Sequence, residues 1–272
     1  MKKIITFLLL CMALPLTAQN YKALAEKALR YVEKDSLVQA EKLFKEAISV
    51  NHDEKETVAL YCNLGLIQRQ MKHYSDATDS YTMALRADPK STAILLKRAL
   101  IYMEEGLEAT ALTDYNQALA LQPDNKEALT VRAFLHSKRG ELDEARADYN
   151  HLRVLEPNSY DARLGLAMLA QKQKDFRSAM ELLNSLISEF PSSASLYLAR
   201  ANVEMDITQP DLALIDVERS ITLDPKAPEA FVLRGDIHLR LKKKALAQQD
   251  YLRALKAGAS QAEVRAKLQK SK

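Results

Sequence analysis

A repeat of 34 residues constrains this chain more than any other feature of its sequence. Prolines recur at this spacing, and each one closes a run of apolar residues at helical spacing: Pro89, Pro123, Pro157, Pro191 and Pro225. An alanine stands twelve residues before each proline, and the series continues once more beyond the last: Ala77, Ala111, Ala145, Ala179, Ala213 and Ala247. A fixed period of this length indicates stacked units, and it overrides the one or two globular domains that 272 residues would otherwise suggest.

Each repeat divides into two amphipathic helices. Within residues 92–125, Leu95, Ala99 and Tyr102 share one helical face, and Gly106 separates this helix from the next. The composition agrees with stacked helices, because 47% of the residues are hydrophobic, 28% are charged and only 6 are glycine. We therefore expect an all-α protein built from helical hairpins.

This pattern resembles the tetratricopeptide repeat. In the second repeat the signature positions of that family are occupied by Leu64, Gly65, Ala77, Tyr81, Ala84 and Pro89. The resemblance implies a right-handed superhelical solenoid of about seven hairpins over residues 19–259. The expected repeats are residues 21–54, 58–91, 92–125, 126–159, 160–193, 194–227 and 228–259. The first repeat departs from the signature, with His52 in place of the proline.

Residues 260–272 are expected to form a C-terminal capping helix. Ser260 and Glu263 have the spacing of a capping box, which marks the start of a helix. Val264 and Leu268 can then face the last repeat, while Lys267 faces water. The end of a repeat array needs such a polar cover, because its last apolar face has no neighbouring repeat.

Residues 1–18 have the pattern of a secretory signal peptide. Lys2 and Lys3 precede an apolar run at residues 4–14, and Ala18 precedes the expected cleavage site at Gln19. The apolar run spans roughly half of a ~30 Å hydrocarbon core, so we expect no membrane span after cleavage. An uncleaved anchor stays an alternative. By analogy with bacterial leaders, we expect an exported protein that is periplasmic or associated with the cell envelope. Its mature part has one cysteine, Cys62, which we expect to be a small buried apolar residue.

Arginine and aspartate pairs recur with the repeat, and the two members of each pair are 16 residues apart. Two repeats lack both members and have Leu64 with Ser80, or Leu166 with Leu182. Because the two positions change together, we expect structural ion pairs that join the helices of a hairpin, rather than catalytic acids and bases. The expected pairs are Arg98 with Asp114, Arg132 with Asp148, Arg200 with Asp216 and Arg234 with Asp250.

In proteins with this repeat the concave surface, formed by the first helix of each repeat, usually binds the partner. The resemblance places an apolar stripe with interspersed polar residues there: Asn63, Leu66, Leu96, Lys97, Leu100, Met103, Phe134, Lys138, Leu164, Met168, Lys172, Leu198, Asn202 and Met205. Such a surface suits an extended or helical apolar segment of a partner. Alternatively, several of these side chains pack between neighbouring first helices and are not exposed. Phe134, Met168 and Met205 are the contacts that we favour.

Enzyme chemistry is not indicated. The five histidines are scattered over different repeats without a metal-binding spacing, and the chain has neither a glycine-rich phosphate loop nor a nucleophile elbow. We therefore expect no catalytic residue, no cofactor, no metal and no small-molecule substrate. The formal net charge of +3 gives no reason to expect a nucleic acid partner.

The sequence therefore favours an exported, non-enzymatic scaffold or adaptor that binds a peptide or protein segment in the concave groove. The alternative is a structural subunit of a cell-envelope assembly that docks through its convex face or its ends. The capped C-terminus slightly favours the adaptor, because it resists stacking onto a neighbour. A monomer is favoured, but the sequence identifies neither the oligomeric state nor the partner nor the pathway.

Overall fold

The computed structural model describes residues 20–51 and 54–271, without the side chains of residues 54, 55 and 263. The expected signal peptide lies outside the described residues. Within them the chain forms helices joined by turns, and no strand is present. The chain divides into two compact units, Met1–Leu135 and His136–Lys272, and each is described by itself.

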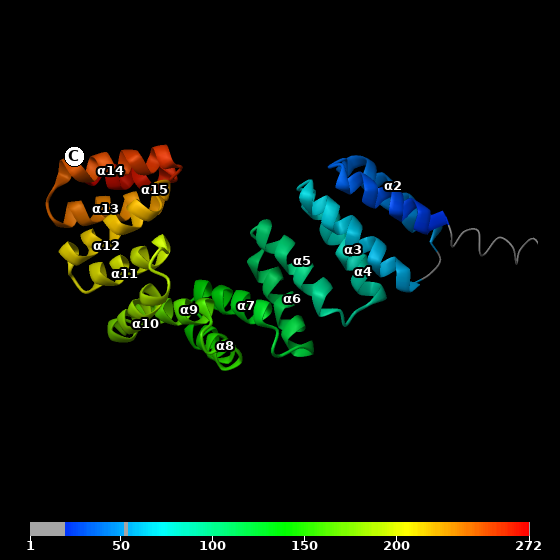
Figure 1. The fold of residues 1–272 in the computed structure, drawn as a ribbon, viewed down its shortest axis with the longest axis horizontal. Coiled ribbons are helices and arrows are strands. Elements are labelled where there is room, and N and C mark those ends of the chain that lie inside the picture. Colours follow the sequence, from blue (N-terminus) through cyan, green and yellow to red (C-terminus); the bar gives the residue numbers. More distant parts are fainter. Residues whose placement is uncertain (1–19, 52–53, 272) are drawn as a thin grey trace, which may run out of the picture. The chain divides into compact units, whose positions relative to one another are not determined.

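The first unit begins with a helix at residues 20–33. It continues with α2 (Leu37–Val50), α3 (Glu54–Gln70), α4 (Tyr74–Ala87), α5 (Thr92–Glu104), α6 (Glu108–Leu121) and most of α7 (Lys126–Arg139). Helix α3 packs on α4, and α5 packs on α6, as hairpins (Figure 1). Helix α3 begins at Glu54, earlier than residue 58, where we expected the second repeat to start.

The second unit contains the remaining helices. They are α8 (Leu142–Leu155), α9 (Tyr160–Lys172), α10 (Phe176–Glu189), α11 (Ala194–Asp206), α12 (Pro210–Leu223), α13 (Pro228–Arg240), α14 (Lys244–Ala257) and α15 (Gln261–Lys270). The pairs α9 with α10, α11 with α12 and α13 with α14 form hairpins within the expected repeats (Figure 1). The all-α repeat fold expected from the sequence is therefore confirmed.

The turn inside each hairpin places a residue in the left-handed backbone region. These residues recur every 34 positions, with φ between 60° and 81°: Lys72, Gly106, Gly140, Lys174, Thr208 and Lys242. Glycine adopts this conformation freely, whereas other residues pay roughly 1–2 kcal/mol for it. Even the β-branched Thr208 is held there, so the packing of the two helices sets the turn geometry.

Small residues allow the two helices of a hairpin to approach closely. The alanines that recur with the repeat, such as Ala77 and Ala213, are fully buried. A Cβ atom built at Gly235 would lie only 2.5 Å from Cε1 of Tyr251, whose ring is itself fully buried. Gly65 and Tyr81 repeat the arrangement at 2.9 Å. The small and aromatic signature positions therefore form one close contact.

Helix α15 covers the last hairpin. Val264 is fully buried against it, and Leu268 packs beside Val264, as expected. Lys267 is 30% exposed, and its ammonium group pairs with Asp236 of α13, which also accepts a hydrogen bond of 2.8 Å from Tyr251. Ser260 makes no side-chain capping bond, and the side chain of Glu263, the other half of the expected capping box, lies outside the described residues.

Three of the four expected ion pairs are present as two-pronged contacts. Nε and Nη2 of Arg98 donate to the two carboxylate oxygens of Asp114, at 2.8 and 2.7 Å. The same geometry joins Arg200 to Asp216, at 2.6 and 2.8 Å, and Arg234 to Asp250, at 2.9 and 2.6 Å. Asp114, Asp216 and Asp250 are buried.

The fourth expected pair, Arg132 with Asp148, has its members in different units and stays a prediction. Asp148 is buried on α8. Arg132 of α7 donates a hydrogen bond of 3.0 Å to Asn116 of α6, in the preceding hairpin.

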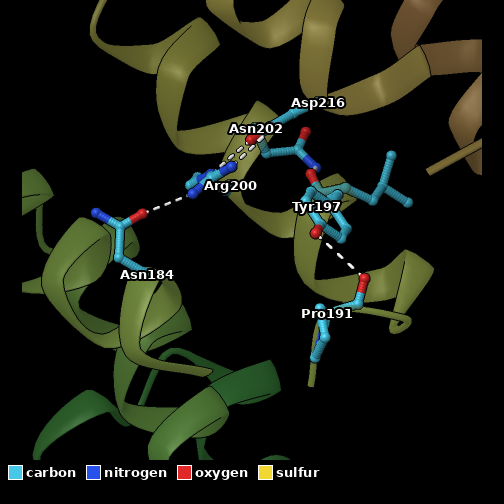
Figure 2. A network of polar contacts seen from close by, with 7 residues as sticks. Asn184, Pro191, Tyr197, Arg200, Asn202 and Asp216 are labelled. Atoms are coloured by element: carbon cyan, nitrogen blue, oxygen red, sulfur yellow. Dashed lines mark hydrogen bonds and ion pairs between the residues drawn. The ribbon is translucent and has the colours of Figure 1, made fainter. Parts of the chain in front are cut away.

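The arginines also reach back to the preceding hairpin, which the sequence did not predict. Figure 2 shows Arg200 between Asp216 of its own hairpin and Asn184 of α10, which accepts from Nη1 at 2.7 Å. Nη1 of Arg98 likewise donates to Thr82 of α4 at 3.0 Å. In both cases the acceptor stands 16 residues before the arginine, as far as the aspartate stands after it. Each of these arginines therefore links three helices.

The two repeats without such an arginine use other polar contacts. In the second repeat Gln68 donates to Glu41 of α2 at 3.0 Å and accepts from Ser80 of α4 at 2.7 Å. In the fifth, Arg163 of α9 donates to both carboxylate oxygens of Glu189 on α10, at 2.9 and 2.7 Å.

We expect Asp216→Asn to lower the free energy of unfolding by about 2–3 kcal/mol. The substitution leaves the partly buried charge of Arg200 without its carboxylate, a loss between that of an exposed pair and that of a fully buried one. Urea denaturation followed by circular dichroism measures the change. Glu181→Gln is the matched control, since it breaks an arginine pair whose side chains are 90% and 64% exposed. Equal effects of the two substitutions would contradict a structural role for Arg200 and Asp216.

Glu204 of α11 is a buried acid without an arginine of its own. Its side chain is 5% exposed, and its Oε2 atom has no hydrogen-bond partner in the described structure. Burial, with the nearby charge of Asp216, raises the pKa of Glu204 to about 7, although Arg200 opposes this change. The folded protein therefore favours the protonated form of Glu204.

We expect the free energy of unfolding to fall as the pH rises from about 5 to 8. The reason is that the ionised form of Glu204 is unfavourable in the folded chain, where the carboxylate is buried, and not in the unfolded chain. The folded pKa lies above the unfolded value, so the stabilising effect of the proton is complete below the unfolded pKa and lost as the pH passes about 7. Glu204→Gln should remove this loss, on the order of 1–2 kcal/mol. Denaturation midpoints of both proteins at several pH values test this, and parallel pH profiles would contradict it.

Candidate protein-interaction groove

A cavity of about 280 Å³ in the first unit coincides with part of the expected groove. It lies against α3 and α5, the first helices of two consecutive hairpins. Four expected groove residues line it: Leu66, Leu96, Lys97 and Leu100. Leu66 is 36% exposed at its edge, whereas Leu96 is 8% exposed and forms part of its floor.

Charged groups surround this apolar floor. Lys97 is exposed and makes no hydrogen bond or ion pair within the part of the chain that the structure describes. Nε of Arg69 donates to both carboxylate oxygens of Glu104, at 3.0 Å each, so this arginine is already neutralised. Glu127 of α7 also lines the cavity. Lys97 is thus the cation that the cavity offers to a ligand.

Phe134 extends this surface along α7. Its ring is 48% exposed, as expected for a contact residue. Phe134 follows Glu127 by seven residues, so the two share one face of α7 and lie roughly 10 Å apart along its axis. The remaining expected residues of this unit, Asn63 and Met103, are half-buried on α3 and α5.

In the second unit the expected groove residues behave unequally. Met168 of α9 is 48% exposed, which agrees with a contact residue. Leu164 packs against the core of the hairpin formed by α9 and α10, while Leu198 and Met205 pack where α11 meets α13. Met205, which we favoured as a contact, is half-buried there, so both expectations, contact with a partner and packing between helices, stay predictions.

The expected polar groove residues of the second unit are at the surface. Nζ of Lys172 donates to the Ser137 carbonyl at 2.7 Å, so this lysine links α9 to the end of α7. Nδ2 of Asn202 donates to the carbonyl of Leu198 within its own helix, at 2.9 Å. Lys138 is exposed at the end of α7.

Among the described residues, one group has the composition of a metal site. Potential ligand atoms of Glu41, His73 and Asp76 all lie within 4.8 Å of one another. Lys45 already pairs with the Glu41 carboxylate at 2.7 Å, and Gln68 donates to it as well. Because the Glu41 carboxylate is already paired with a cation, and exposed acidic groups of this kind are common without a metal, this group does not support a metal centre.

Cys62 is half-buried on α3, rather than fully buried as expected, and burial raises the pKa of its thiol. A raised pKa keeps the thiol protonated and unreactive at neutral pH. Within the described ranges, no helix combines the length and the apolar character needed to cross a bilayer.

Comparison with known proteins decides the family. Models of the tetratricopeptide repeat match residues 62–126, 114–147, 161–193 and 198–262. A tetratricopeptide repeat protein from Parabacteroides merdae, known from its crystal structure, is 32% identical, with a TM-score of 0.82. The similarity covers 93% of this chain and 99% of that protein. The chain belongs to the tetratricopeptide repeat family.

Other solved tetratricopeptide structures share the fold at lower identity. PilW, described as a widely conserved type IV pilus biogenesis factor, is 22% identical with a TM-score of 0.64, over 78% of this chain and 96% of PilW. YrrB, described as a tetratricopeptide repeat protein with an unusual peptide-binding site, is 18% identical with a TM-score of 0.56, over 74% of this chain and 97% of YrrB. No curated protein matches the chain.

Two features of this tetratricopeptide repeat protein were missed by sequence reasoning. Arg69 and Glu104 both border the groove region, but they are 35 residues apart in different repeats, and the pairs recognised within repeats did not reveal their contact. Gln171 and Asp206 make the same contact three repeats later, at 2.7 Å. Glu127 contributes to the cavity from the start of α7, two helical turns before Phe134, the first residue of α7 that the family resemblance assigns to the groove. Its place in the cavity follows only from how α7 packs.

Proposed function

We propose that this protein is a non-enzymatic scaffold that binds an apolar segment of a protein partner on the first-helix surface of its first unit. The observation that carries the proposal is the cavity floored by Leu66, Leu96 and Leu100, with the exposed ring of Phe134 on the next first helix. Tetratricopeptide repeat proteins generally act as interaction scaffolds, which agrees with this use of the surface.

The size and lining of the cavity suit side chains of a peptide rather than a whole folded domain. About 280 Å³ accommodates one or two large apolar side chains, and Phe134 offers a further contact two helical turns away from Glu127. Lys97, which has no partner of its own in the described structure, would fix the orientation by pairing with a carboxylate of the segment. An extended or helical segment satisfies both requirements.

We also propose that the protein is exported, with residues 1–18 as the leader. The proposal rests on the sequence of these residues, which are outside the described part of the chain: two lysines, an apolar run and a small residue before the expected cleavage site. The partner would then belong to the periplasm or the cell envelope.

Introducing acids on the groove should abolish partner binding without unfolding the protein. We expect the double variant Leu66→Glu, Phe134→Asp to lose the partner that residues 19–272 capture from an envelope extract, because a buried carboxylate at either contact is strongly unfavourable. Both side chains are partly exposed in the free protein, so the melting temperature should change little. Val154→Asp is the matched control, since Val154 is 78% exposed on α8 in the second unit and does not belong to the groove residues. Equal capture by both variants would remove the groove from the proposal.

Expression of the full chain should yield a shortened protein outside the cytoplasm. We expect a mature N-terminus at Gln19, since Ala18 is the small residue before the predicted cleavage site. N-terminal sequencing of the fractionated protein measures this. A full-length protein that stays in the cytoplasmic fraction would refute export, and a full-length protein in the membrane fraction would indicate the uncleaved anchor.

A further inference from the structure

The second unit contains a cavity of about 430 Å³ that no expected groove residue lines. It opens between α8 and α10, the second helices of two consecutive hairpins, and α9 forms its floor. Leu166, Ala170 and Leu182 supply its apolar surface, while Arg146, Asn150 and Arg153 of α8 border it. On α9, Leu166 lies two positions after Leu164, and Ala170 lies two positions after Met168. Because Leu164 and Met168 are expected groove residues, Leu166 and Ala170 point roughly to the side of the helix opposite to the groove.

The cavity lies where the repeated arginine is missing. Leu166 occupies the register of Arg98, Arg200 and Arg234. The guanidinium groups of Arg98 and Arg200 join the two neighbouring second helices, with acceptors 16 residues before and after the arginine. For Leu166 the corresponding residues are Asn150 and Leu182, and both line the cavity. A leucine is too short to span the gap that the arginine spans elsewhere.

The second repeat also lacks the arginine but closes the gap differently. There Leu64 is buried, and Gln68, one turn further along α3, bridges Glu41 and Ser80. The residue in the register of Gln68 in the fifth repeat is Ala170, whose methyl group cannot reach either neighbour. The fifth repeat has therefore lost both side chains that fill this space in the other hairpins.

Other contacts hold the fifth hairpin together. Arg163, which is 7% exposed, ties α9 to Glu189 and also donates to Ser185 at 2.8 Å. Tyr149 of α8 packs its ring directly on Gly165 of α9. These contacts join the same three helices, so the chain does not need the arginine bridge here, and an open cavity is retained at a cost in stability.

The charged side chains at the rim of this cavity differ in whether they have a partner of opposite charge. Arg146, Asn150 and Arg153 are spaced four and three residues apart, so they lie along one face of α8. Arg146 has Asp175 as an electrostatic neighbour, and Glu181 pairs with Arg177 at 2.9 Å. Arg153 has no hydrogen bond or ion pair within the described residues. The rim therefore offers one unpaired cation beside a neutral amide.

We propose that this cavity is a second docking site, which receives a large apolar side chain from a protein partner while Arg153 and Asn150 bind a neighbouring carboxylate of the same segment. The volume accommodates at least one side chain of the size of Leu or Phe, and the unpaired Arg153 selects for an acidic neighbour. This site lies on the second-helix side of its unit, so it is independent of the proposed groove. It is also the kind of feature through which an envelope subunit would dock by its outer face.

The sharpest test restores the bridge that the other repeats contain. In the double variant Leu166→Arg, Leu182→Asp, the new arginine should pair with the new aspartate and with Asn150, as Arg200 pairs with Asp216 and Asn184. Because this fills the cavity with a contact that the chain already uses, we expect the variant to melt at or above the temperature of the natural protein. Random peptides displayed on phage are selected on residues 19–272 and counter-selected on this variant.

We expect the selected peptides to combine a large apolar residue with an adjacent Asp or Glu. Their Kd, measured by fluorescence anisotropy, should rise at least about tenfold for the double variant. The same rise is expected for Arg153→Glu. Because Arg153 is exposed, this second variant keeps the fold even if the double variant does not. The groove variant Leu66→Glu, Phe134→Asp should bind them unchanged, which separates this site from the proposed groove. Failure to enrich any peptide, equal binding to the filled variant, or enrichment of Lys and Arg peptides would overturn the proposal.

Discussion

Close packing of two helices at a small residue is the constraint on which the rest of this structure depends. Where Gly235 meets the ring of Tyr251, even one added carbon would lie within 2.5 Å of the ring. This contact fixes the distance and register of the hairpin, and every other feature then occupies a set position in a 34-residue frame. The turn at Thr208 shows the strength of the constraint, because a β-branched residue accepts a left-handed backbone to keep the register.

The arginine bridges are a consequence of that register. Because neighbouring hairpins repeat at a constant offset, an arginine such as Arg200 meets one acceptor 16 residues ahead and another 16 residues behind. The bidentate geometry and burial of Asp216 make each link costly to break from one side only. Stability in such an array is a sum of repeat and neighbour terms. A bridge can therefore be lost in one repeat and offset locally, as Arg163 and Glu189 do in the fifth.

Contacts whose two positions change together between repeats were predictable from the sequence. Other contacts were not, including the repeated bonds from Arg98 to Thr82 and from Arg200 to Asn184. The joint variation of Arg98 with Asp114 across repeats identified a contact without any structure. Arg163 with Glu189, and Lys267 with Asp236, depend on the packing of particular side chains and have no repeated pattern. The same limit applies to the groove: the family resemblance named the register of Met205 but could not show that its side chain packs against the cluster formed by α11, α12 and α13. The cavity at Leu166 was hidden because its cause is the absence of a side chain.

Two surfaces distinguish this chain from a uniform scaffold. In the first unit, Leu66 on α3 and Phe134 on α7 leave an apolar register exposed, and α5 carries the unpaired Lys97. In the second, the replacement of an arginine by Leu166 and of a larger residue by Ala170 opens a space on the opposite side of a first helix. This open space costs stability that the repeated contacts offset. A repeat protein can thus acquire distinct binding surfaces through changes at one or two register positions, while the alanine and tyrosine contacts that define the frame stay as they are.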